Sequence, residues 1–296
     1  LKGALQIKGN RLPHRLWTGT GGSPWSRIMR HATLLGGGEV TGHDHGTGYG
    51  LHIQSLPIIT EFESCTRFVT FNEAQAKALR ESTEGDVLLR NRPAPAIVAV
   101  PRRDGEPVPS RPCLSMVSKP VARSSDAPSV MYSSSRYLGE QVRAWPPIPD
   151  VVGVDWEARL FGKIRDWGYD VLHKPHPSSI ALPYDEFSKK LGVRLFTERF
   201  EEVFHAADLL IMISPHSTTF TVALASQKPI VFVDFGLDKW IPEVYELLKR
   251  RCSIVQGRFD EHNRLQVDWD ELRAGMEESK GLGDRTLMDK YLELTY

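Results

Sequence analysis

Residues 208–233 read DLLIMISPHSTTFTVALASQKPIVFV and hold one complete strand–helix–strand pattern. The apolar run Asp208–Ile213 predicts a buried strand, and Pro229–Val233 predicts a second one. Between them, the alanine-rich segment Thr218–Ser226 predicts a helix. Strands that are apolar on both faces are typical of parallel sheets covered by helices on each side. The stretch therefore predicts the α/β class.

The same alternation continues on both sides of this stretch. Further strands are predicted at residues 129–132, 169–173, 193–196 and 252–255, and helices at 155–167, 184–191, 200–207 and 239–250. The last 40 residues or so read as closing helices. Residues 129–296 are therefore predicted to form one Rossmann-like domain.

The N-terminal part has the same style with fewer clear elements. Strands are predicted at 39–41 and 67–71, and Asn72 is the expected N-cap of a helix over 72–81. No strand or helix is evident before residue 39, and the glycine-rich composition up to Gly50 predicts loops. Residues 1–89 thus predict a second α/β domain that is short or truncated. Residues 90–128 are proline-rich and predict a linker, with one candidate strand at Ala96–Val100.

Composition excludes several classes of protein. The 296 residues carry 37 Lys and Arg against 37 Asp and Glu, whereas a non-specific nucleic-acid binder has a basic excess. The longest apolar runs are far too short to cross a bilayer, and the residues after Leu1 do not show the charged and then apolar pattern expected of a signal peptide. The three cysteines are odd in number and widely spaced, which indicates reduced thiols. We expect a cytoplasmic protein that does not bind nucleic acid.

The first motif that points to chemistry is Lys174-Pro175-His176-Pro177, directly after the predicted strand 169–173. Ligands of open parallel sheets bind beyond the carboxyl ends of the strands. The two prolines fix the backbone on either side of His176, so the imidazole is presented at that edge. The alternative is a rigid turn whose histidine is only a surface polar group.

The second motif is the run Ser217, Thr218 and Thr219, where a predicted strand turns into a helix. Free amides and the helix dipole at such a position favour an anion, although Ser and Thr are also common N-caps. Together the two motifs would suit a diphosphate or a phosphodiester. No P-loop is present, and neither Gly19-Thr20-Gly21 nor Gly46-Thr47-Gly48 follows a convincing strand in dinucleotide-binding spacing.

The order of these motifs resembles the nucleotide-binding half of GT-B glycosyltransferases. The resembling elements are the His-Pro motif, the acidic segment Phe200–Asp208, the strand with its Ser/Thr turn, and the helix that ends before Lys228-Pro229. Within that superfamily, the chain is similar to the CDP-glycerol glycerophosphotransferases, sialyltransferases and Kdo transferases of bacterial surface-polysaccharide synthesis. The resemblance implies two Rossmann-like domains and a donor activated by a nucleotide, with CMP or CDP favoured, and no further cofactor.

The resemblance also implies roles for individual residues. His176 and Lys174 would contact the donor phosphate, and Ser217 and Thr218, with Thr219 close by, would bind it through hydroxyls and amides. In the loop after the strand 129–132, Ser134 and Arg136 would lie near the nucleotide. Glu201 or Glu202 would hold the ribose, the alternative being a surface charge that the helix dipole favours.

The acceptor side is predicted from the segment Gly42–Gly46, which follows the strand 39–41. His45-Gly46 resembles a step in the first domain of the glycerophosphotransferases, which makes His45 the expected catalytic base and Asp44 the alternative. Two other interpretations stay open. His43, Asp44, His45 and His52 could bind a divalent metal with a carboxylate from Glu61 or Glu63, or the segment could be a plain glycine-rich turn.

These observations predict a metal-independent transferase that moves a sugar, or a glycerol-phosphate-like group, to a hydroxyl of a glycan or lipid-linked glycan. The alternatives are a non-catalytic nucleotide- or phosphate-binding module and a metal-dependent hydrolase that uses His43, Asp44 and His45. A basic stretch predicts peripheral contact with the inner face of the cytoplasmic membrane. Its residues are Arg90, Arg92, Arg102, Arg103, Arg111, Lys119 and Arg123.

Overall fold

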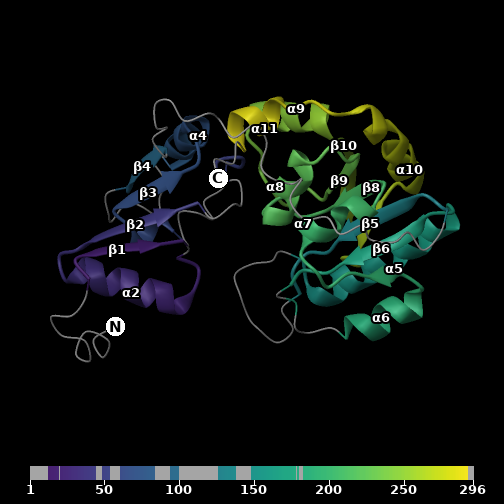
Figure 1. Ribbon diagram of the computed structural model, residues 1–296, viewed down its shortest axis with the longest axis horizontal. Coiled ribbons are helices and arrows are strands. Elements are labelled where there is room, and N and C mark those ends of the chain that lie inside the picture. The colour runs from purple at the N-terminus through teal and green to yellow at the C-terminus, as the bar shows by residue number, and fades with distance from the viewer. Residues whose placement is uncertain are drawn as a thin grey trace. The chain divides into compact units, whose positions relative to one another are not determined.

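The computed structural model describes residues 13–19, 21–44, 49–53, 61–83, 94–99, 126–137, 148–177, 179 and 183–292 (Figure 1). These residues form two compact units. The first holds the described residues up to 99 together with 239–244 and 288–292, and the second holds 126–238 and 245–287. Each unit contains a parallel sheet with helices, so the predicted α/β class is confirmed.

The second unit is built on a sheet with the strand order β11-β10-β9-β8-β5-β6-β7. All neighbours in it are parallel except the pair β10 and β11. Counted along the chain from β5, its parallel strands lie in the order 3-2-1-4-5-6, which is the Rossmann order. The strands are β5 (Ser129–Ser133), β6 (Asp170–Lys174), β7 (Arg194–Leu195), β8 (Leu209–Met212), β9 (Ile230–Asp234), β10 (Ser253–Phe259) and β11 (Leu265–Val267).

Helices cover both faces of this sheet, as the apolar strands predicted. They are α5 (Asp150–Asp166), α6 (Tyr184–Leu191), α7 (Phe200–Val203), α8 (Thr218–Ala225) and α10 (Trp269–Glu278), with the 3-10 helices η4 (Phe204–Ala206) and η5 (Ser279–Gly281). Helices α9 (Pro242–Arg251) and α11 (Thr286–Tyr291) have residues in both units.

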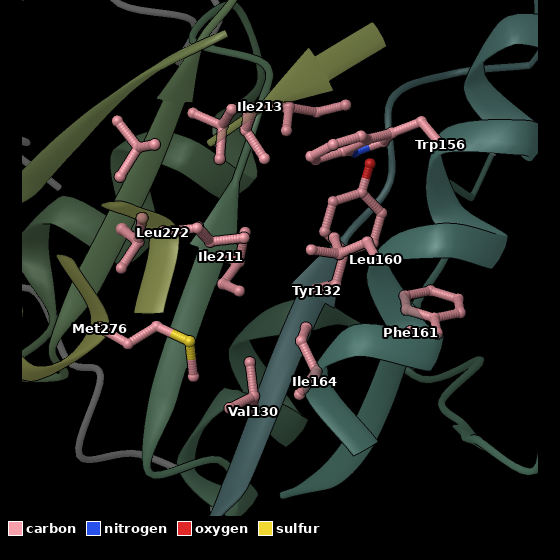
Figure 2. Close-up of a cluster of buried hydrophobic side chains, with 14 of the residues drawn as sticks. Val130, Tyr132, Trp156, Leu160, Phe161, Ile164, Ile211, Ile213, Leu272 and Met276 are labelled. Carbon is pink, nitrogen blue, oxygen red and sulfur yellow. The ribbon is translucent and has the colours of Figure 1, made fainter. Parts of the chain in front are cut away.

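The core of the second unit lies between the sheet and helices α5 and α10 (Figure 2). Val130 and Tyr132 of β5 pack with Leu160 and Ile164 of α5, and none of the four is measurably exposed. Phe220 of α8 packs against Phe232 of β9, with their ring centroids 5.2 Å apart. This pair lies outside the cluster that the sheet forms with α5 and α10. The burial of β5 and β8 along their whole length explains why their sequences read as continuous apolar runs.

The first unit has a four-stranded parallel sheet in the order β1-β2-β3-β4. Its elements are β1 (Arg15–Thr18), α2 (Pro24–Leu35), β2 (Glu39–His43), η2 (Phe62–Ser64), β3 (Arg67–Thr70), α4 (Glu73–Thr83) and β4 (Ala96–Ala99). The predicted N-cap of α4 is confirmed, because Asn72 Oδ1 accepts a hydrogen bond from Gln75 N at 2.9 Å. The strand expected at Ala96–Val100 is β4 and pairs with β3.

The described part of the glycine-rich beginning, residues 13–19 and 21–44, is not made of loops alone, so that prediction was wrong there. These residues contain β1 and α2, so a strand does precede Gly19, contrary to the prediction. β1 escaped notice because it is a short edge strand, with Arg15 and Trp17 exposed. The signal for α2 was present in Ser23, whose side chain accepts a hydrogen bond from Ser26 N, and in the proline that follows it.

Several sequence-based predictions concern residues outside the ranges that the structure describes. His45, the segment Gly46-Thr47-Gly48, Cys113, the basic stretch and most of the predicted linker lie outside the described residues. Cys65 and Cys252 are unpaired and buried, and burial raises the pKa of each thiol to about 12. Among the described helices, none is long and apolar enough to cross a membrane.

Candidate functional site

The strand order of the second unit brings the predicted phosphate-binding segments to one edge of the sheet. β5 lies between β6 and β8, and Ser133 at its end is in register with Lys174 of β6 and Met212 of β8. The loops after these three strands therefore start side by side. Because the chain reverses its strand order between β5 and β8, this edge is the topological switch point, where ligands of open α/β sheets bind.

Lys174 and His176 provide the polar groups beyond β6. Lys174 is buried, and its Nζ donates to the Pro175 carbonyl at 2.9 Å. Burial lowers the pKa of this ammonium, while Glu198 and Glu201 act in the opposite direction. His176 is partly buried, and burial together with the charges of Arg136 and Lys174 lowers its pKa to about 4. At neutral pH the site therefore holds a neutral imidazole, which can donate one hydrogen bond to a phosphate oxygen.

The loop after β5 is joined to the loop after β6 by its backbone. Ser134 N donates to the Lys174 carbonyl at 3.0 Å, and Tyr137 N donates to Ser179 Oγ at 2.8 Å. The charge of Arg136 reaches His176, so the predicted residues Arg136, Lys174 and His176 lie together. The Ser134 hydroxyl turns inward instead, because its Oγ lies 2.7 Å from His173 Nε2.

The acidic residue predicted to hold a ribose lies near the same group. Glu201 is exposed in the first turn of α7, and its charge acts on Lys174. Glu202 is also exposed. Glu198 and Glu201 both raise the pKa of Lys174, so Glu201 interacts electrostatically with this ammonium.

The third segment is the N-terminus of α8. Ser217 is its N-cap, and its Oγ accepts a hydrogen bond from Phe220 N at 3.1 Å and donates to the Ser214 carbonyl at 3.3 Å. The capping interpretation of this hydroxyl therefore holds. Thr218 is exposed and Thr219 partly exposed, and their amides belong to the first turn, where the helix itself supplies no acceptor. These two residues present donors and the positive end of the dipole to an anion.

Three residues at this edge were not selected from the sequence. His216 Nε2 lies 2.5 Å from Oδ1 of Asp238, which follows β9. Asp234, at the end of β9, accepts from Gly236 N at 2.8 Å and from the Tyr245 hydroxyl at 2.9 Å, which shapes the turn that leads to Asp238. The rule that selected the ends of β6 and β8 would have found both carboxylates if it had been applied to β9.

The predicted acceptor residues lie at the end of β2 in the first unit. Asp44 is 1 % exposed, its N donates to the Val69 carbonyl at 2.9 Å, and its own carbonyl lies 2.7 Å from His43 Nδ1. His52 is buried with its ring 4.1 Å from that of Trp240. His45, the favoured base and the third member of the predicted metal set, lies outside the described residues.

Glu61 and Glu63, considered as extra carboxylates, have other partners in this unit. Glu61 Oε2 lies 2.9 Å from Arg30 Nη1 and accepts from Gly21 N at 2.7 Å, with both side chains of the ion pair almost completely buried. Glu63 lies 3.3 Å from Arg27 on the surface. Glu61 thus ties Arg30 of α2 to Gly21, which lies shortly before that helix.

Eleven chains of solved structures match this chain. No protein-family profile and no curated protein sequence matches the chain. Among solved structures, the UDP-GlcNAc 2-epimerase of Methanocaldococcus jannaschii, solved in complex with UDP-GlcNAc and UDP, aligns with a TM-score of 0.47 and 11% identity. The alignment covers 94% of this chain and 71% of that one. A likeness at this level says nothing about activity.

Proposed function

We propose that the chain is a GT-B-type transferase that moves a sugar, or a glycerol-phosphate-like group, from a nucleotide-activated donor to a hydroxyl of a surface glycan. One observation carries the proposal. The loops that carry Arg136, Lys174 and His176 and the loop that leads to α8 all begin at the switch point of a Rossmann-ordered sheet. They supply a guanidinium, an ammonium, a neutral imidazole and helix amides, which together suit a diphosphate.

The donor diphosphate is the leaving group in this proposal, and the site acts on the charge that develops there. Lys174 and Arg136 supply positive charge, while His176 and the amides of Thr218 and Thr219 supply hydrogen-bond donors. Such donors are already oriented before the reaction, so little reorganisation opposes their action. Glu201, whose charge acts on Lys174, would accept hydrogen bonds from the ribose hydroxyls.

The acceptor hydroxyl requires a base, which we assign to the end of β2. Asp44 is 1 % exposed, so it is poorly placed to reach a soluble acceptor. His45 is therefore the residue to substitute first. A general base of this kind contributes about 10²–10⁴-fold to the rate.

The test is the thermal stability of the full chain with CMP, CDP, UDP, GDP or ADP. A ligand that binds only the folded chain raises its apparent stability by RT ln(1 + [L]/Kd). We expect a cytidine nucleotide to raise Tm and His176→Ala to abolish the rise. His262→Ala is the control and should keep the rise, because the His262 side chain is 75% accessible and belongs to none of the segments of the proposed site. If none of the five nucleotides raises Tm, the proposal is wrong.

Turnover separates a transferase from a nucleotide-binding module. We expect the chain to release CDP or CMP from a cytidine-activated donor in the presence of a glycan acceptor, and His45→Ala to slow this release. If the nucleotide binds but no donor is consumed with any acceptor tested, the module is the correct interpretation and the transferase is excluded.

A further inference from the structure

A buried polar cluster lies beneath the loops of the proposed donor site. Glu157 of α5 and His173 of β6 have no measurable exposure, and Ser134 after β5 is 5% exposed. Their neighbours in the core are apolar, among them Leu160, Phe161 and Ile164 of the same helix. Burying a carboxyl group among such residues is expensive unless other groups interact with it. The cluster therefore calls for an explanation beyond packing.

The contacts within the cluster run from the helix to the site loops. Glu157 Oε2 lies 3.7 Å from His173 Nε2, and the same ring nitrogen lies 2.7 Å from Ser134 Oγ. The other ring nitrogen, Nδ1, lies 3.2 Å from Ser188 Oγ of α6. His173 is thus held from three sides, and it immediately precedes Lys174 in the strand.

The same cluster fixes the loop after β5. The Tyr137 and Ser134 hydroxyls lie near enough to the Glu157 carboxyl group to lower its pKa, although neither carboxyl oxygen has a hydrogen bond of normal geometry to a described residue. Tyr137 N donates to Ser179 Oγ beyond the His-Pro motif. Gly153 of α5 leaves room for the Tyr137 ring, because a Cβ at that position would lie 2.6 Å from it. One helix of the core therefore touches both ends of the loop that carries Arg136.

We propose that Glu157 is a positioning residue for the phosphate-binding site, which it shapes through His173, Ser134 and Tyr137, and that binding of an anionic nucleotide is coupled to protonation of this carboxyl group. The inference rests on the proposed function, because it assigns Glu157 to the same site. Glu157 touches no substrate in this proposal. It sets the relative placement of the loops after β5 and β6.

The charges around Glu157 give the coupling its direction. Burial raises the pKa of Glu157 to about 7, so the carboxyl group is half ionised near neutral pH. A bound phosphate adds negative charge nearby, which favours the neutral acid, so affinity should fall as pH rises through about 7. The groups that face Glu157 do not titrate there: burial lowers the pKa of His173 to about 3 and raises those of Tyr132, Tyr137 and Tyr184.

The experiment measures Kd for CDP-glycerol and for UDP-GlcNAc by isothermal titration calorimetry from about pH 5.5 to about pH 8.5. Both probes are diphosphate diesters, so they lack the secondary phosphate ionisation near pH 6. We expect wild-type affinity for one of them to fall about tenfold across this range, which corresponds to a ligand-induced pKa change of about one unit. Glu157→Gln, a neutral isostere of the acid, should keep the low-pH affinity over the whole range.

A control variant and a second calorimetric measurement make the outcomes distinct. Glu261→Gln alters a carboxylate whose side chain is 85% exposed, and it should keep the wild-type profile. Any fall in affinity at high pH that Glu157→Gln retains comes from a group other than Glu157. If Glu157→Gln does not fold, calorimetry of the wild type in two buffers of different ionisation enthalpy gives the same answer, because binding near pH 7 should take up protons.

Each outcome decides a different question. A pH-dependent wild type with a flat Glu157→Gln profile supports the inference. If the wild type binds a probe without proton uptake, or Glu157→Gln keeps the wild-type profile, the positioning role is wrong while nucleotide binding stands. If the wild type binds neither probe at about 1 mM, the proposed function fails and the inference fails with it.

Discussion

The imidazole of His216 and the carboxylate of Asp238 join the ends of two neighbouring strands, with Nε2 2.5 Å from Oδ1. His216 precedes the N-cap of α8 and Asp238 follows β9, so the contact ties the helix N-terminus to the adjacent loop. Both side chains are largely buried, with accessibilities of 19% and 9%. Solvent therefore screens this contact less than it screens a surface ion pair.

Asp238→Asn should lower the stability of the chain, because it replaces a charge-assisted hydrogen bond at a largely buried position. We expect a loss of about 1–3 kcal/mol, measured as a lower Tm by calorimetry. The double variant with His216→Ala should lose less than the sum of the single variants if the two side chains interact directly. His262→Ala is the control, because its pairing with Glu261 at 3.5 Å is exposed and should contribute less than about 1 kcal/mol.

Two glycines of α5 should respond in opposite directions to alanine. At Gly153 the new Cβ would lie 2.6 Å from the Tyr137 ring, whereas at Gly162 nothing lies within 4 Å. We expect Gly162→Ala to stabilise the chain by about 0.5–1 kcal/mol through helix propensity. Gly153→Ala should lose about 1–3 kcal/mol through overpacking, which propensity offsets only in part.

Urea denaturation of both variants provides the measurement. Gly153→Ala should also weaken nucleotide binding, because Tyr137 lies in the loop of the proposed site. An equal gain in stability for both alanine variants would show that the Tyr137 ring can move aside without strain. It would contradict the prediction that a Cβ at position 153 overpacks the core.

The sequence predicted the second unit well because its strands are buried on both faces. Strands such as β8 are apolar throughout, so they can be recognised without knowing which strands lie next to them in the sheet. β1 was missed because an edge strand with an exposed Trp17 has no such run. β11 was missed because it pairs with β10 through a tight turn in which Asn263 takes a positive φ of 57°, and no glycine marks the position.

The candidate site was predictable to the extent that its residues follow strand ends. Lys174, His176 and Thr218 were found by that rule, and the fold places them at one edge. Glu157 was not found, because it lies inside a helix and its partner His173 lies inside a strand. A buried polar pair of this kind depends on tertiary contacts between segments, which no local pattern contains.

The ion pair between Arg30 and Glu61 should be sensitive to removal of either partner. Both side chains are almost completely buried, at 0% and 1% exposure, and Arg30 also donates to Thr18 Oγ1 at 2.6 Å. Glu61→Gln leaves the guanidinium without its counter-charge, so we expect a loss of about 3–5 kcal/mol in the first unit.

Replacing both members of the ion pair tests whether the loss of stability comes from the buried charge that a single substitution leaves without a partner. The double variant Arg30→Met with Glu61→Met should lose less than the sum of the single variants, as judged by thermal unfolding. Arg27→Met is the matched control on the same helix, because its pair with Glu63 is exposed and should change stability by less than about 1 kcal/mol. Strict additivity of the two buried substitutions would contradict a direct charge interaction.

Glu157 should make the stability of the folded chain fall as pH rises toward neutral. Its pKa is raised from 4.5 to about 7 by burial, so between these values the folded chain keeps a proton that the unfolded chain has released. Stability therefore decreases with pH at up to about 1.4 kcal/mol per unit in this window, and the contribution is fully present below pH 4.5 and lost above about 7. Glu157→Gln cannot titrate.

The difference in unfolding free energy between wild type and Glu157→Gln, measured with urea at several pH values, should become less favourable to the wild type as pH rises. A difference that is constant from about pH 5 to about pH 7 would show that the carboxyl group does not change its ionisation on folding, because linkage requires a pH slope wherever the proton counts differ.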